Sequence, residues 1–102
     1  MLTFLATMKI KAEKEQLFIH LAHELTEQTL ANESGCLAYR FYKLRQPLGY
    51  AVLESFESAA AEQAHQASSH FQAIAADMLA CIDGTYSRQY LDPLPEAAAG
   101  PD

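Results

Sequence analysis

The spacing of apolar side chains changes period along the chain and marks out the first predicted elements. Residues 2–10 alternate between apolar and less apolar side chains, which is typical of a β-strand with one buried face. Residues 13–32 instead place apolar side chains three and four positions apart, which predicts an amphipathic helix. Two apolar runs follow, 36–43 and 50–56, separated by a loop with Arg, Gln, Pro and Gly. We expect these runs to pair as a β-hairpin.

The next part of the chain predicts a helix in two pieces. Ser58 can cap a short alanine-rich helix over residues 59–66, and either Ser68 or Ser69 can cap the helix after it. This second piece carries an apolar stripe at helical spacing, made of Phe71, Ile74, Ala75, Met78, Leu79 and Ile82.

A last strand completes the pattern. Asp83-Gly84 ends the preceding helix, and residues 85–91 again have the character of a strand. Beyond it, residues 93–102 are rich in Pro and Ala, and we expect a loosely ordered tail. The sequence therefore predicts one domain over residues 1–92.

The element order β-α-β-β-α-β predicts an α+β fold of the ferredoxin-like kind. In this plan a four-stranded antiparallel sheet carries both helices on one face. The other face needs cover, because large exposed apolar patches are rare in monomers. A second copy packed sheet against sheet is the simplest cover, so we expect a homodimer.

Composition and charge exclude several classes of function. The chain has 102 residues, 50% of them hydrophobic, and a net charge of −6, with no basic cluster that could neutralise phosphates. We therefore expect neither nucleic-acid nor anionic-membrane binding. No apolar stretch approaches the roughly 20 residues of a membrane span. No charged segment precedes the first apolar run, so we interpret the start as a strand and not a signal peptide. Cys36 and Cys81 are expected to be free thiols in a reducing cytoplasm.

The hairpin has one face that mixes charged and aromatic side chains. Arg40 and Glu54 stand among aromatics there, which a wholly packed sheet would not favour. We expect Glu54 to pair with Arg40 across the hairpin, to act as an acid or base in a pocket, or both. Four aromatic residues would line a cavity suited to a planar ring, unless they are simply core: Tyr42, Tyr50, Phe56 and Tyr86.

Four short motifs, in order and in register with these elements, resemble the antibiotic biosynthesis monooxygenase (ABM) family. They are Glu33-Ser-Gly-Cys-Leu-Ala-Tyr39, Leu53-Glu-Ser-Phe-Glu-Ser58, Ala64-His65 and Ser68-Ser-His-Phe71. The resemblance implies a dimeric α+β barrel. It also implies a small enzyme that oxidises quinols, anthrones or other electron-rich phenols with O2, without metal or flavin. Phe56 stands where the family commonly has Trp, which argues against the haem-degrading activity of some members.

Within that resemblance, His70 is the first candidate for a catalytic base. It stands at the start of a helix, where the dipole favours the neutral imidazole. Forming a phenolate needs such a base. His65 would orient the substrate or His70, and Phe71 and Arg40 would contact the substrate. The alternative is that both histidines hold the junction between the two helices, and that Arg40 only neutralises Glu54.

Two other functions stay open at this stage. The same charged and aromatic face would suit isomerisation or breakdown of a small phosphorylated signal molecule. The chain could also be a non-catalytic dimeric module that binds a small apolar ligand. A metal is not expected, because His20 and His23 share a helix face with Glu24 but no further ligand is evident. No nucleotide-binding glycine loop occurs, so no cofactor is expected.

Overall fold

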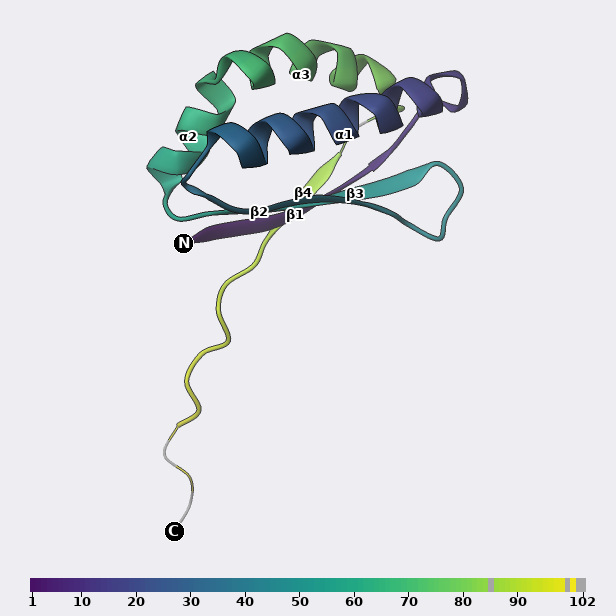
Figure 1. Cartoon of the computed structure of the whole chain (residues 1–102). Coiled ribbons are helices and arrows are strands. Elements are labelled where there is room, and N and C mark those ends of the chain that lie inside the picture. Colours follow the sequence, from purple (N-terminus) through teal and green to yellow (C-terminus); the bar gives the residue numbers. More distant parts are fainter. Residues whose placement is uncertain (85, 99, 101–102) are drawn as a thin grey trace.

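The computed structural model describes residues 1–84, 86–98 and 100, and shows two layers, a sheet and a set of helices (Figure 1). The strands are β1 (Leu2–Lys9), β2 (Cys36–Lys43), β3 (Gly49–Phe56) and β4 (Ser87–Tyr90). The helices are α1 (Glu15–Asn32), α2 (Ala59–Ala67) and α3 (Ser69–Cys81), and a short 3-10 helix, η1 (Ala12–Lys14), precedes α1.

The sheet is antiparallel with strand order β2-β3-β1-β4, and all three α-helices cover one of its faces (Figure 1). This is the ferredoxin-like plan, so the predicted α+β fold class is confirmed. The predicted hairpin strands agree with β2 and β3 to within one residue. β4 is shorter than the predicted 85–91, and Thr85 lies outside the described residues. Residues 91–98 and 100 form no helix or strand, and the division of the chain at residue 92 stays a prediction.

The register of the hairpin overturns one pairing expected from the sequence. Tyr39 stands opposite Glu54, whereas Arg40 stands opposite Leu53. Because cross-strand partners share a face, Glu54 lies on the helix-covered face with Tyr39, and Arg40 lies on the other. The expected Arg40–Glu54 pair is therefore wrong. Alternation alone cannot reveal which face of one strand matches which face of the next, because the register decides it.

The core lies between the sheet and the helices. Phe4 of β1, Phe18 of α1 and Phe56 of β3 are each at most 1% exposed. Burying aromatic side chains of this size supplies a large part of the hydrophobic stabilisation of a small domain. Smaller side chains complete this core, among them Ile10, Leu25, Ile74 and Cys81.

Ser68 makes the elbow between α2 and α3. Its extended backbone (φ −66°, ψ 151°) ends α2, and its side-chain oxygen accepts a hydrogen bond from the amide of Phe71 at the start of α3. The same hydroxyl donates to the carbonyl of His65 at 2.6 Å. One serine thus pairs with a backbone carbonyl at the end of α2 and a backbone amide at the start of α3, and this fixes the angle between the two helices.

Replacing this serine should destabilise the elbow. We expect Ser68→Ala to lower the free energy of unfolding by about 1 kcal/mol, the usual cost of losing an N-cap. The melting temperature should fall by roughly 4–8 °C. Thermal unfolding followed by circular dichroism measures this, with Ser69→Ala as the control because Ser69 is exposed beside it. Equal melting of the two variants would contradict the capping role.

Candidate functional site

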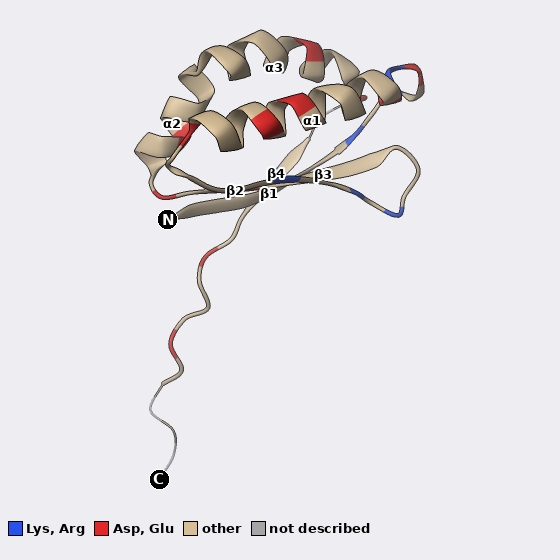
Figure 2. Cartoon of the chain, in the orientation of Figure 1, with Lys and Arg blue, Asp and Glu red and all other residues tan. Residues whose placement is uncertain are grey.

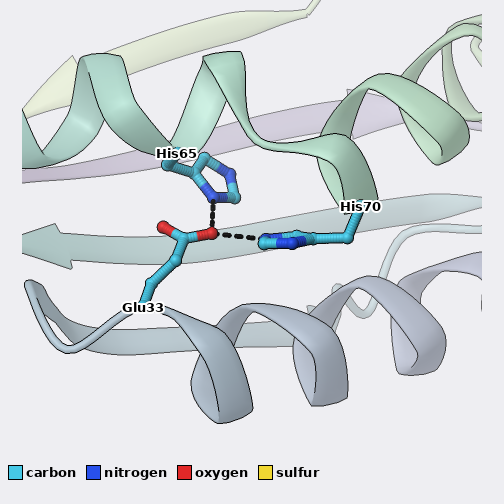
Figure 3. Close-up of side chains that lie close together, drawn as sticks. All are labelled: Glu33, His65 and His70. Carbon is cyan, nitrogen blue, oxygen red and sulfur yellow. Dashed lines mark hydrogen bonds and ion pairs between the residues drawn. The ribbon is translucent and has the colours of Figure 1, made fainter.

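Three side chains from different segments converge beside this elbow (Figure 3). Glu33 directly follows α1, His65 lies in the last turn of α2, and His70 is the second residue of α3. One oxygen of Glu33, Oε2, is 2.8 Å from His65 Nδ1 and 2.5 Å from His70 Nε2. The three ligand-type atoms all lie within 4.8 Å of one another. We call this group the Glu33–His65–His70 cluster.

Sequence reasoning identified the two histidines of the cluster but missed Glu33 as a functional side chain. The position of Glu33 in the sequence already indicates a special role, because a carboxylate just after a helix C-terminus faces the negative end of the helix dipole. Such a position is unfavourable unless a cation or hydrogen-bond donor compensates for it. The two imidazoles provide that compensation here.

His65 is the buried member of the cluster, with 2% of its surface exposed. Its ring packs against aromatic rings of β2, β3 and α3, with centroids 5.2 Å from Tyr39, 5.3 Å from Phe56 and 4.9 Å from Phe71. Its second nitrogen, Nε2, has no hydrogen-bond partner among the described residues. The nearest acidic atom is Oε1 of Glu54, 3.9 Å away. The ring therefore stands between Glu33 and Glu54.

Glu54 belongs to a cavity of about 260 Å³ between the sheet and helices α1 and α3. Most of its wall is apolar or aromatic, and the charged side chains on it are Glu54 and Arg88. We call it the inter-layer cavity. Its aromatic walls are Phe18, Tyr39, Phe41, Phe71 and Tyr86.

Burial changes the acidity of the groups in this cavity. It raises the pKa of Glu54 to about 8, with the neighbouring Arg88 guanidinium opposing the shift. The pKa of Tyr39 is raised for the same reason, and by the nearby Glu54. The guanidinium carbon of Arg88 lies 3.9 Å above the ring centroid of Phe4. One of its nitrogens, Nη1, lies 3.3 Å from a carboxylate oxygen of Glu62. The cavity thus offers a carboxyl group and a guanidinium within a mostly apolar wall.

His70 opens onto a different concavity, a groove of about 980 Å³ between the end of α1 and the α2–α3 elbow. We call it the elbow groove. Three glutamates line it, Glu24, Glu33 and Glu57, and its lining includes no lysine or arginine. Figure 2 shows the wider pattern, with acidic residues along the helices and the C-terminal tail, and basic residues at the sheet, its hairpin loop and the segment before α1.

The remaining predicted site residues lie elsewhere. Arg40, Tyr42 and Tyr50 line a third depression between α1 and strand β2, of about 400 Å³. The Tyr50 hydroxyl donates to a carboxylate oxygen of Glu15 at 2.8 Å. Phe56 is fully buried in the core. Of the predicted site residues, the structure brings Glu54, Phe71 and Tyr86 together at the inter-layer cavity, with His65 directly behind its wall.

Neither cysteine has the character of a nucleophile. Both are free thiols, as predicted. Burial, with a contribution from Glu33, raises the pKa of Cys36 to about 11, and burial also raises the pKa of Cys81. Both thiols therefore stay protonated at neutral pH, and the reactive thiolate is scarce.

The chain matches the model of the antibiotic biosynthesis monooxygenase family over residues 1–77. That is most of the sequence, and the chain belongs to this family. The predicted resemblance is confirmed, and it indicates a monooxygenase-like function. No curated protein matches the chain. No helix among the described residues is long and apolar enough to cross a membrane.

Solved structures of the same shape support this assignment. An antibiotic biosynthesis monooxygenase crystal structure is 28% identical, with a TM-score of 0.84, and the match covers 93% of this chain and all of the other. A conserved protein from Methanosarcina mazei Go1 is 30% identical, with a TM-score of 0.81 and coverage of 88% and 89%. A candidate antibiotic biosynthesis monooxygenase from Caulobacter crescentus CB15 is 29% identical, with a TM-score of 0.85 and coverage of 92% and 90%.

Proposed function

We propose that the protein is a cofactor-independent monooxygenase that oxidises a quinol, an anthrone or another electron-rich phenol with O2. The observation that carries this proposal is the inter-layer cavity, where Glu54 and Arg88 are the charged groups of a mostly apolar and aromatic wall that also includes Gln66. A planar aromatic ring fits such a wall, and its hydroxyl needs a small number of oriented polar partners.

The two charged groups have complementary roles in this proposal. In its ionised form, which predominates above its pKa of about 8, Glu54 accepts the hydrogen bond of the substrate hydroxyl and takes up its proton, which produces the electron-rich phenolate. Arg88 faces the same space and stabilises the negative charge on the substrate oxygen. The phenolate passes electrons to O2, one oxygen atom enters the ring system and the other leaves as water. The substrate supplies all four electrons, so no external reductant is required.

This assignment moves the base from His70, the residue favoured from the sequence, to Glu54. His70 lines the elbow groove and is hydrogen-bonded to Glu33, whereas the aromatic wall surrounds Glu54. A phosphorylated substrate is a poorer fit, because Arg88 is the one cationic side chain among the described residues that line the cavity, and Glu54 lies on the same wall. A group bearing two negative charges would meet a carboxylate there.

We further propose that two copies pair through the sheet face that the helices leave uncovered. By register, Leu5, Tyr42 and Leu53 lie on this face, and Tyr42 of the edge strand β2 is 44% exposed. Burying such apolar surface favours association. The mass of the protein in solution, measured by light scattering, tests this, and a monomer at micromolar concentration would contradict it.

The oxygenase proposal is tested by O2 consumption. The purified chain, treated with a chelator and free of flavin, is supplied with hydroquinones, naphthols and anthrones, and uptake is measured with an oxygen electrode. We expect enzyme-dependent uptake with at least one ring class, accompanied by incorporation of label from ¹⁸O2 into the product. No uptake above the uncatalysed rate with any of these compounds would overturn the proposal.

A further inference from the structure

The Glu33–His65–His70 cluster lies outside the inter-layer cavity and has the donor atoms of a metal site. Two imidazole nitrogens and one carboxylate oxygen come from three separate segments and lie within 4.8 Å of one another (Figure 3). Two histidines with one carboxylate form a ligand set that Zn²⁺ binds in proteins. We propose that this cluster is a Zn²⁺ site, with Glu33 Oε2, His65 Nδ1 and His70 Nε2 as ligands.

The second nitrogen of His65, unpartnered within the described part of the chain, supports this assignment. If Nδ1 binds the ion, the ring proton must move to Nε2, and Nε2 then needs an acceptor. That nitrogen has no partner among the described residues, and Glu54 Oε1 stands 3.9 Å from it. A ligating histidine usually donates its second N–H to a carboxylate or carbonyl, which fixes its orientation. Glu54 is the neighbouring acceptor for this nitrogen, although 3.9 Å is longer than a hydrogen bond and the side chains would have to move closer when the ion binds.

The surroundings also favour a cation. Glu33 and His70 open onto the elbow groove, which provides access from solvent. Glu24 and Glu57 line the same groove, and no lysine or arginine is part of its lining. The local potential is therefore negative and attracts divalent ions. The fourth ligand of a tetrahedral Zn²⁺ ion would come from the groove, as water or a small anion.

Binding here would join the end of α1, the end of α2 and the start of α3. The site does not exist in the unfolded chain, so the ion would stabilise the fold by mass action. It would do so without touching a substrate in the inter-layer cavity. The inference shares Glu54 with the proposed oxidation, but Zn²⁺ binding is measured without any substrate, so the two proposals can fail separately.

The test is isothermal titration of tag-free, chelator-treated protein with Zn²⁺ alone. We expect one saturable site per chain, and a rise in melting temperature of roughly 10 °C or more at a hundredfold excess over the Kd. His70→Gln should weaken the affinity by about 100-fold or more, because it removes a ligand but replaces a partly exposed side chain. In NMR spectra, the chemical shifts of the imidazole resonances of His65 and His70 should change on adding Zn²⁺, and those of His20 and His23 should not.

The matched control is the double variant His20→Gln, His23→Gln on the exposed face of α1, where His20 lies 3.9 Å from Glu24. It should bind Zn²⁺ like the original chain. A second pair tests the outer partner: Glu54→Met should weaken binding by about 10- to 100-fold, and Glu54→Gln by less, because its amide oxygen still accepts the His65 N–H. Absence of saturable binding up to about 1 mM, unchanged binding in His70→Gln, or loss of binding in the α1 double variant would each overturn the proposal.

Discussion

Glu54→Gln should lower the turnover of phenol oxidation by about 10²- to 10⁴-fold, the usual contribution of a positioned base. Glutamine keeps the size of the side chain and one acceptor oxygen, but it cannot take up a proton. Substrate binding should therefore change little, and the loss should fall on kcat. The measurement is initial O2 uptake at saturating concentrations of the best substrate in the phenol panel.

Two comparisons make this result specific. Glu27→Gln, on the exposed surface of α1, changes charge equally and should keep the original rate. Arg88→Met should also slow turnover, because the phenolate loses its cation, while the aromatic walls stay in place. If Glu54→Gln retained the original turnover, Glu54 would not be the base, and His70 would again be the leading candidate.

The fold could be predicted from the sequence because its signals are local. Alternation over residues 2–10 and the helical stripe from Phe71 to Ile82 each report a period that needs no knowledge of the rest of the chain. Ser58 was a predicted cap of α2, and its side chain indeed accepts a hydrogen bond from the amide of Ala61. The same holds for Ser68 and α3.

The composition of the site could be predicted only in part, because it depends on register and on contacts between distant segments. Arg88 comes from β4, whose pairing with β1 brings it to the cavity beside β3. Nothing local in the sequence distinguishes it from Arg40, which the hairpin register turns to the opposite face. Glu33 meets His65 and His70 across 32 and 37 residues of sequence, and period analysis carries no information on such contacts.

The aromatic residues show the same limit, since a Tyr or Phe in a strand pattern is equally consistent with core and with a ligand wall. The sequence pattern predicts both Phe56 and Tyr86 as cavity residues. In the structure Phe56 is 0% exposed and packs on His65, while Tyr86 is 46% exposed and lines the inter-layer cavity. Truncation of Phe56 should therefore lower mainly the stability, and truncation of Tyr86 mainly the affinity for substrate.

Phe56→Ala should lower the free energy of unfolding by about 3–5 kcal/mol, because it leaves a void that the packed core cannot fill. That is a large fraction of the roughly 5–15 kcal/mol available to a domain of this size. Tyr86→Ala should cost clearly less, about 1 kcal/mol, since nearly half of the side chain is already exposed. Urea unfolding followed by circular dichroism measures both. If the free energy of unfolding depends on urea concentration with the same slope in each variant, only stability has changed.

The activity of the two variants completes the distinction. The folded fraction of Phe56→Ala should oxidise the substrate with a nearly unchanged KM, because Phe56 does not line the cavity. Tyr86→Ala should instead raise KM, since it removes part of the aromatic wall and leaves the charged groups in place. A stable Phe56→Ala variant with weakened substrate binding would show that the substrate lies deeper than the inter-layer cavity, against the buried rings around His65.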